Sequence, residues 1–453
     1  MSLVVRAGLL VTGSGERLES GWLRSRNGEI VEMGSGPLPE AGEVLDLPNC
    51  VAVPGLVNSH DHLYQQATRG FNHGDGLFGW LKALYPVWAE LDAEVVRAAA
   101  RAGIGRLLLA GCTLSTDHHY IFPAGRTGIF EALVEAAAEL GIRFQPCRGS
   151  MSLGEAQGGL PPDSLVEDDD AILADCERLV ARYHDPAPGS LCRVTIAPCS
   201  PFSVTERQMR ESAQLARKLG VRLHTHLAET VDEDEFCVSK FGLRPLDLLE
   251  EFGWLDSNVW LAHGVHFSAA EMARLAAHGT GVAHCPSSNM RLGAGACPVA
   301  DLLAAGVPVG LGVDGASSNE DYDLVGEIRQ ALLLARLRAA MLGQPEPASA
   351  LSPAMAWRLA TAGGAAVLGR TDCGTLTVGK RADVALYRSD DLGRSGIPDP
   401  FVALALDPPS RAEAVVVEGR VVVRGGRLLT ADEDTLALEV AAASRRLLGV
   451  LYA

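Results

Sequence analysis

Short hydrophobic runs alternate with amphipathic stretches along most of the chain. Between the runs, apolar residues recur with helical period over 93–109, 128–140, 169–183, 206–219, 269–277 and 324–341. Eight runs of strand length end near His60, Asp117, Arg148, Pro198, His226, His263, His284 and Asp314. Strand and helix units that alternate in this way indicate an α/β protein with a parallel sheet, either closed as a (β/α)8 barrel or open and doubly wound.

Both ends of the chain show a different pattern, in which short strands are separated by glycine-rich turns. Residues 4–7, 21–24 and 29–32 lack helical period, and 382–387 and 414–423 have the same texture. The last run predicts a hairpin around Glu418-Gly419. Because a lone hairpin is only marginally stable, we expect the two ends to pair. The expected organisation is a small β-sandwich domain from 1–52 and 376–453, with a helix over 432–448, around a barrel at 53–375.

Polar residues at the strand ends favour the closed barrel over the open sheet. The run 51–57 predicts a buried strand, and residues i and i+2 of a strand face the same side, as His60 and His62 then would. His226, His263 and Asp314 stand at the ends of the fifth, sixth and eighth strands. Only a closed barrel brings all of these strand ends around one mouth.

These residues suggest metal-assisted hydrolysis. His60, His62, His226 and Asp314 offer three imidazoles and one carboxylate, a set that zinc and ferrous iron both accept. A divalent metal in a catalytic site lowers the pKa of water toward neutrality. Glu229, three residues past His226, is placed to shuttle a proton. His263 can polarise the attacked centre or orient the hydroxide, and Asp314 can also accept a proton from the water.

Other histidines and the long connections are less specific. We expect ordinary structural roles for His73, His184, His266 and His278, and packing for His224, whereas His118, His119 and His284 face the mouth. The connections 69–91 and 149–168 are long enough to cover the site. The aromatic residues of the first connection either pack as a lid or stack on substrate, namely Phe78, Trp80, Tyr85 and Trp88.

Composition narrows the choice of partners. The chain has 453 residues, 47% of them hydrophobic and 21% charged, which is typical of a globular protein. A net charge of -17 and the lack of a basic stripe disfavour nucleic acid and anionic membranes. Ten cysteines without a Cys-x-x-Cys pair favour free thiols in a reducing cytoplasm. We expect no membrane span and no secretory signal.

The chain resembles the amidohydrolase superfamily, specifically its deaminase or aminohydrolase branch. The resemblance rests on segments 54–62, 224–229, 262–264, 312–315 and 379–383. It implies a mononuclear site with His60, His62, His226 and Asp314 as ligands. Binuclear members carry a carboxylated lysine on the fourth strand, and residues 193–198 contain no lysine.

Within that branch, the chain is most similar to the 8-oxoguanine deaminases, with isoxanthopterin deaminases and s-triazine hydrolases close by. The supporting segments are 63–65, 77–81, 148–152, 158–164, 197–203 and 283–292. The resemblance implies deamination of 8-oxoguanine to urate, with isoxanthopterin, guanine, a cytosine-type ring or an s-triazine as alternatives. It implies that Gln65 binds the substrate ring. We expect Trp80, His118 and Arg148 as further substrate contacts.

Three positions depart from this branch and bear on the substrate. They are Asp61 and His119, where relatives often carry His and an apolar residue respectively, and Ser287, where 8-oxoguanine deaminases often carry Cys.

A homodimer is a further expectation from the family. The alternative of another class is a non-catalytic scaffold barrel, which would be expected to lose metal ligands or the acid-base glutamate. All of them are present in this chain.

Overall fold

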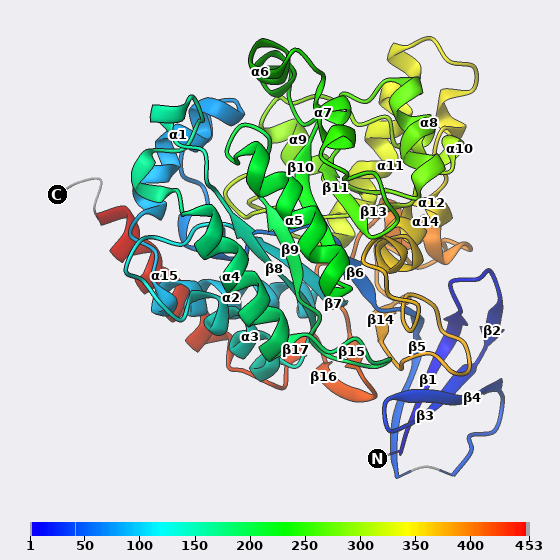
Figure 1. Ribbon diagram of the computed structural model, residues 1–453. Helices are drawn as coiled ribbons and strands as arrows, with labels where there is room; N and C mark the ends of the chain where they lie inside the picture. Colours follow the sequence, from blue (N-terminus) through cyan, green and yellow to red (C-terminus); the bar gives the residue numbers. More distant parts are fainter. Residues whose placement is uncertain (1, 41, 450–453) are drawn as a thin grey trace.

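A computed structural model describes residues 2–40 and 42–449, and its centre is a closed barrel of eight parallel strands (Figure 1). The pairing of the last barrel strand with the first closes the ring. All eight predicted strands are present, so the closed barrel is confirmed over the open sheet. In chain order the strands are β6 (Leu56–Asn58), β7 (Cys112–His119), β8 (Arg143–Ser150), β9 (Thr195–Pro198), β10 (Arg222–Leu227), β11 (Val259–His263), β12 (Gly281–His284) and β13 (Val309–Leu311).

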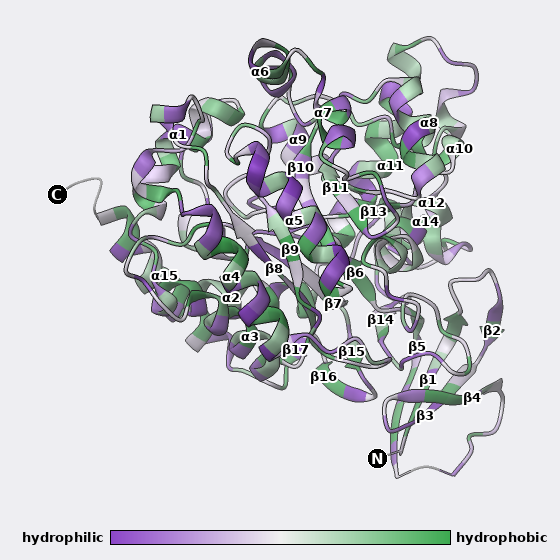
Figure 2. Ribbon diagram, in the orientation of Figure 1, coloured by the Kyte–Doolittle hydropathy of each residue, from purple (hydrophilic) through white to green (hydrophobic). Residues whose placement is uncertain are grey.

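The helices predicted from periodicity surround the barrel. They are α2 (Ala93–Leu109), α3 (Ile129–Leu140), α4 (Asp169–Tyr183), α5 (Glu206–Leu219), α8 (Ala269–His278) and α11 (Leu324–Met341). Side-chain caps set several starts, as where Thr205 accepts from the backbone N–H of Gln208. Figure 2 shows hydrophilic and hydrophobic residues alternating along α3, α4 and α5, as the amphipathic pattern requires.

Shorter helices fill the connections around this ring. They are α6 (Val231–Phe241), α7 (Pro245–Glu251), α9 (Pro286–Arg291), α10 (Val299–Ala305), α12 (Pro353–Arg358), α13 (Gly364–Val367) and α14 (Pro400–Leu406). Turns of 3-10 helix are η1 (Leu63–Thr68), η2 (Glu155–Gln157), η3 (Asp163–Leu165) and η4 (Pro347–Ser349), and η5 (Leu359–Gly363) is a π-helix. No helix in the described part of the chain is both long enough and apolar enough to cross a membrane.

Both chain ends contribute to one mixed sheet of nine strands, which confirms the expected pairing of the ends (Figure 1). The central strand β5 pairs with β1 on one side and with β14 on the other. The predicted hairpin is confirmed, with Glu418 and Gly419 at φ of +52° and +71° between its strands. The strands are β1 (Ser2–Val11), β2 (Arg17–Glu19), β3 (Gly21–Arg26), β4 (Glu29–Ser35), β5 (Glu43–Pro54), β14 (Val384–Arg388), β15 (Ala414–Val417), β16 (Arg420–Arg424) and β17 (Arg427–Leu428).

The hydrophobic run 51–57 is not the single strand that its pattern predicts. Its first part ends β5 in the small sheet, and its second part begins β6 in the barrel. The break lies at Gly55, where a Cβ atom would stand 2.2 Å from the Thr113 hydroxyl oxygen. Since β6 ends at Asn58, His60 and His62 lie beyond the strand. Strand alternation therefore does not explain why they face the same centre.

The connection 69–91 also differs from the loop that its length suggested. It contains the helix α1 (Leu77–Trp88), which has Pro86 in its last turn, two residues before its end. The C-terminal helix α15 (Glu433–Gly449) packs beside α2, where Arg101 contacts Glu439 and Arg446 contacts Asp92.

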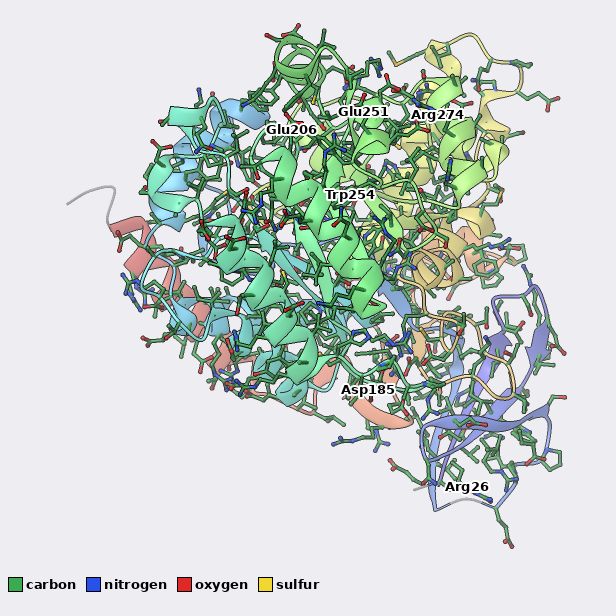
Figure 3. All side chains as sticks on the ribbon, in the orientation of Figure 1. Arg26, Asp185, Glu206, Glu251, Trp254 and Arg274 are labelled. Carbon is green, nitrogen blue, oxygen red and sulfur yellow. The ribbon has the colours of Figure 1, made fainter. Side chains whose placement is uncertain are left out.

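In Figure 3, Glu206 marks the barrel end where the strands terminate, and Asp185 marks the opposite end, beside the small sheet. The polar residues that follow the barrel strands lie at the end marked by Glu206.

Candidate active site

Four of the predicted side chains meet at the carboxyl ends of the barrel strands. His60 and His62 follow β6, His226 lies on β10, and Asp314 follows β13. Asp314 Oδ1 is 3.4 Å from Nε2 of both His60 and His62, and His62 Nε2 is 3.1 Å from His226 Nε2. Each side chain is buried. The structure thus brings together groups from three strands that lie far apart in the sequence.

Backbone carbonyl groups determine which nitrogen of two imidazoles is protonated. His62 Nδ1 donates to the carbonyl of His118 at 2.6 Å, and His226 Nδ1 donates to the carbonyl of Cys199 at 2.7 Å. A carbonyl can only accept, so the neutral rings carry their lone pairs on Nε2. The two lone pairs face each other across 3.1 Å, an arrangement that a cation between them would stabilise.

His224 orients the third imidazole. Its Nδ1 donates to the carbonyl of Trp260 at 2.9 Å, so its Nε2 accepts from His60 Nδ1 at 2.8 Å. His60 Nε2 is then left as a buried lone pair without a hydrogen-bond partner. We predicted packing for His224, and the structure adds this hydrogen bond. Three imidazole lone pairs and the Asp314 carboxylate together fit a divalent zinc or iron ion.

Burial keeps the imidazoles of His62 and His226 neutral, which is the state that binds metal. Burial, followed by the proximity of His60, lowers the pKa of His62 to about 3. Burial, followed by the proximity of His118, lowers the pKa of His226 well below its usual value. Burial raises the pKa of Asp314, but the proximity of the His60, His263 and His62 imidazoles outweighs that effect and lowers it overall. Asp314 is therefore an anion beside the neutral rings of His62 and His226.

Glu229 and His263 lie beside this group. Glu229 Oε2 is 3.5 Å from His263 Nε2, and His263 Nδ1 is 2.9 Å from Asn289 Oδ1. Burial, followed by the charges of Asp314 and Glu233, raises the pKa of Glu229 well above its usual value. Burial lowers the pKa of His263 to about 4. His263 is therefore neutral near neutral pH, and the raised pKa of Glu229 favours its protonated form.

The backbone at this mouth adopts unusual conformations. Ala228, His263 and Asp314 have φ of +52°, +73° and +60°, in the left-handed region that non-glycine residues rarely occupy. They stand at the ends of β10, β11 and β13, next to or at the polar side chains just described. Strained backbone of this kind persists only where the surroundings hold it, and it clusters at functional sites.

A pocket opens directly over these groups, with about 370 Å³ of empty space including its mouth. Gln65 lines it, and its Oε1 accepts from the backbone N–H of Ser317 at 3.3 Å, so its Nε2 is the amide atom available to donate to a ligand. Apolar walls come from α1 and neighbouring segments. The pocket is lined by His62, Gln65, Leu77, Trp80, Leu81, Tyr120, Cys199, Phe202, His226, Glu229, His263, Leu292, Asp314 and Ser318.

Two expected substrate contacts, His118 and Arg148, lie outside this lining. His118 is below the mouth, where its Nε2 donates to the carbonyl of Ala197 at 2.8 Å and its ring stacks on His226 at 4.6 Å. Its ligand nitrogen lies within 4.8 Å of those of His60 and His226. Arg148 pairs with Glu167 and Asp175 at 2.7 Å each. Those ion pairs hold Arg148 beside α4, away from the pocket.

Three supporting residues escaped sequence reasoning. Tyr322 donates to the buried Asp61 carboxylate at 2.7 and 2.6 Å from its two oxygens. Asn289 accepts from His263, and Glu233 accepts from the backbone N–H of Glu229. Glu233, four residues after Glu229, offered a sequence signal. Nothing local in the chain indicated Tyr322, which lies 261 positions from Asp61.

The barrel and this arrangement of histidines, aspartate and glutamate at its mouth are features of hydrolases of the amidohydrolase type. The chain matches the Amidohydrolase family over residues 51–422 and belongs to that family. It is 48% identical over 405 residues to 8-oxoguanine deaminase from Pseudomonas aeruginosa, covering 88% of this chain and 89% of the relative. It is 41% identical to an isoxanthopterin deaminase from an unknown prokaryotic organism, covering 83% of this chain and 81% of the relative.

Solved structures agree with this placement. The fold matches the atrazine chlorohydrolase TrzN from Arthrobacter aurescens TC1 complexed with zinc, with a TM-score of 0.92 and 33% identity, covering 98% of this chain and all of the other. Hydroxydechloroatrazine ethylaminohydrolase from Pseudomonas sp. strain ADP is 39% identical, covering 97% of this chain and 94% of the relative. These relatives bear out the expectation that the chain is a hydrolase acting on carbon–nitrogen bonds, an aminohydrolase.

Proposed function

We propose that the protein is a metal-dependent deaminase that converts 8-oxoguanine and water to urate and ammonia. The observation that carries this proposal is the convergence of the His60, His62 and His226 imidazoles with Asp314, beside a pocket that Glu229 lines and in which the pKa of Glu229 is raised. The identity of 48% with an 8-oxoguanine deaminase supports this substrate over the other amino-heterocycles.

The proposed ligands are His60, His62, His226 and Asp314, with zinc as the first candidate and ferrous iron as the alternative. A divalent metal held there lowers the pKa of a water molecule and supplies a nucleophile at neutral pH. The zinc in the similar atrazine chlorohydrolase structure supports the choice of zinc. Metal analysis of the purified protein tests both identity and stoichiometry.

Glu229 moves the protons of the proposed reaction. Its raised pKa keeps a proton available near neutral pH, which it donates to a ring nitrogen as the oxygen of water adds to the amino-bearing carbon. The same carboxylate then takes a proton from the added oxygen and delivers it to the amine, which leaves as ammonia, and the second proton of that oxygen returns to Glu229 as the carbonyl group of the product forms. His263, neutral and oriented by Asn289, is placed to polarise the attacked carbon.

Gln65 and Trp80 are the proposed substrate contacts that line the pocket. The amide nitrogen of Gln65 can donate to a carbonyl or ring nitrogen of the heterocycle. The indole nitrogen of Trp80 is buried without a hydrogen-bond partner, and it offers a second donor on the wall of the pocket. Two donors can bind acceptor atoms such as the oxo groups of 8-oxoguanine.

Ammonia release from a panel of heterocycles, measured with protein of known metal content, tests the proposal. The panel holds 8-oxoguanine, isoxanthopterin, guanine, isocytosine, cytosine, melamine and hydroxyatrazine. We expect the highest kcat/KM with 8-oxoguanine. A preference for pterins or triazines would support the proposed deaminase reaction and contradict the proposed substrate. No release at full metal occupancy would contradict the deaminase and favour the scaffold alternative.

Two further expectations belong to this proposal. The ten cysteines are all free thiols, which supports a reducing compartment such as the cytoplasm. A homodimer stays a prediction from the family, and sedimentation analysis of the purified protein tests it.

A further inference from the structure

We propose that Glu233, which lies outside the pocket lining, is a positioning residue for Glu229. The inference rests on the proposed function, in which Glu229 transfers protons. Glu233 is the third residue of α6, and its side chain is fully buried. Its Oε2 accepts from the backbone N–H of Glu229 at 2.9 Å.

This contact is not an ordinary helix cap. A glutamate at the third position of a helix usually reaches back to the backbone N–H of the N-cap residue. The N-cap of α6 is Thr230, and Glu233 reaches past it to Glu229. The exposed Asp232 already places an acidic group in the first turn of α6. Charge at the helix start therefore does not require a buried carboxylate.

The turn that Glu233 holds is strained. Ala228 occupies the left-handed region, with φ of +52°. On one side of the turn, the Ala228 carbonyl accepts from the backbone N–H groups of Val265 and His266 at 2.8 and 3.0 Å. On the other side, Glu233 accepts from Glu229. The turn carrying Glu229 is thus clamped between the connection after β11 and the first turn of α6.

Loss of this acceptor should displace Glu229 and leave the proposed metal ligands in place. Glu229 depends on the turn for its position beside His263. His226, by contrast, lies on β10 and is oriented by the carbonyl of Cys199. A defect in proton transfer without a defect in metal binding is therefore the signature of a positioning role, because a general structural defect would affect both.

The test compares three variants on metal-loaded protein, with the best substrate of the panel. Glu233→Met removes the acceptor with little change in size, and kcat should fall about 100-fold, the scale of a small misplacement of a catalytic group. Its KM and metal content should stay within about threefold of wild type. Glu233→Gln keeps an amide oxygen that can accept from Glu229, so kcat should recover to within about tenfold. Glu235→Gln, on the exposed face of α6, is the matched control and should behave as wild type.

A wild-type kcat in Glu233→Met, or equal losses in Glu233→Met and Glu233→Gln, would overturn the positioning role. If Glu233→Met does not fold, Glu233→Asp replaces it, since its carboxylate is one methylene too short to reach Glu229 and kcat should fall. Loss of metal together with kcat would indicate a structural role and would also overturn it. Failure of the proposed function looks different, because the wild-type protein would then release no ammonia from any heterocycle.

Discussion

Each imidazole in the site has one nitrogen held by a partner and the other facing the centre. His62 and His226 donate to backbone carbonyls, whereas His60 donates to the side chain of His224. A side-chain partner can be removed by mutation and a backbone partner cannot. The hydrogen bond from His60 to His224 is therefore the contact in the proposed metal site that mutation can test most directly.

Replacing His224 should weaken metal binding without removing a ligand. His224→Leu deprives His60 Nδ1 of its acceptor, so both the tautomer and the ring orientation of His60 are lost. Removing a hydrogen-bond partner of a metal-binding histidine typically lowers metal affinity about 10–100-fold. Competition with a coloured chelator measures the change. His278→Leu, which changes an exposed histidine, is the control, and an unchanged affinity in His224→Leu would contradict the role of His224.

Glu229→Gln should abolish turnover and leave the metal in place. The amide cannot exchange a proton, and general acid–base catalysis contributes about 10²–10⁴-fold. Steady-state kinetics and metal analysis on the same preparation measure both quantities. In the wild-type enzyme, activity should decline as pH rises through the raised pKa of Glu229, because only its protonated form donates. A near-wild-type kcat in Glu229→Gln would show that another group carries the proton.

His119 should make the protein more sensitive to acid. Burial, partly offset by the hydrogen bond to the Ile121 carbonyl, lowers the pKa of His119 to about 3. In the unfolded chain its pKa is about 6.5, so the unfolded state binds more protons below that pH and stability falls as pH drops. His119→Leu should reduce the loss of unfolding free energy between pH 7.5 and 5.5 by about 1 kcal/mol. Urea unfolding at both pH values measures it, and identical pH dependence would contradict the prediction.

Among the elements, β6 and β13 bring the first and last parts of the site together. Asn58 Oδ1 accepts from the backbone N–H of Val313 at 3.0 Å, and Asn58 Nδ2 donates to Asp61 at 2.8 Å. Tyr322 completes this network from the segment after Asp314. The network joins the turn of His60 and His62 to the connection that carries Asp314. Their relative position therefore depends on buried polar contacts between neighbouring strands.

Tyr322→Phe should loosen this junction. The change removes one hydroxyl and leaves the buried Asp61 carboxyl group short of a donor, which costs about 1–3 kcal/mol. Thermal unfolding measures the loss of stability, and chelator competition should show weaker metal binding. Tyr183→Phe, at a partly exposed ring, is the matched control. Equal stability and equal metal affinity in the two variants would contradict the bracing role.

On the scale of the whole molecule, a buried ionic network joins the barrel to the small sheet. Arg143, on β8, lies 3.1 Å from Asp383 and also contacts Glu418 in the hairpin turn. It also donates to the carbonyls of Gly189 and Ser190 at 2.8 Å each. The Arg143 side chain is fully buried, so the network lies at a desolvated junction between the two parts of the chain.

Arg143→Met should destabilise the protein strongly. It leaves the buried Asp383 without its cation, and breaking a buried pair in this way costs about 3–5 kcal/mol. Arg97→Met provides the contrast, because its ion pair with Glu139 is solvent-exposed and such pairs are worth at most about 1 kcal/mol. Calorimetric melting temperatures distinguish the two. A small shift for Arg143→Met would show that the junction does not depend on this charge.

Much of the fold and of the site was predictable from the chain because the relevant patterns are local. Helical period located α2, α5 and α11 at their observed bounds, and the β-branched runs around Glu418-Gly419 predicted the hairpin. The order of His60, His62, His226 and Asp314 along strand ends predicted that they would converge, because a barrel places all of its strand ends at one mouth.

Other features depended on neighbours that are distant in sequence. The strand expected over 51–57 divides at Gly55 because Thr113 lies against it. Arg148 lies near the carboxyl end of β8, so we expected it to contact the substrate. Its ion pairs with Glu167 and Asp175 instead hold it outside the pocket lining. The tautomer of each histidine follows from which carbonyl or ring lies opposite it. Periodicity and residue order determined the barrel and the set of site residues. Tertiary structure alone decided which nitrogen faces the centre and what holds Glu229, because those contacts join segments that meet only after the barrel closes.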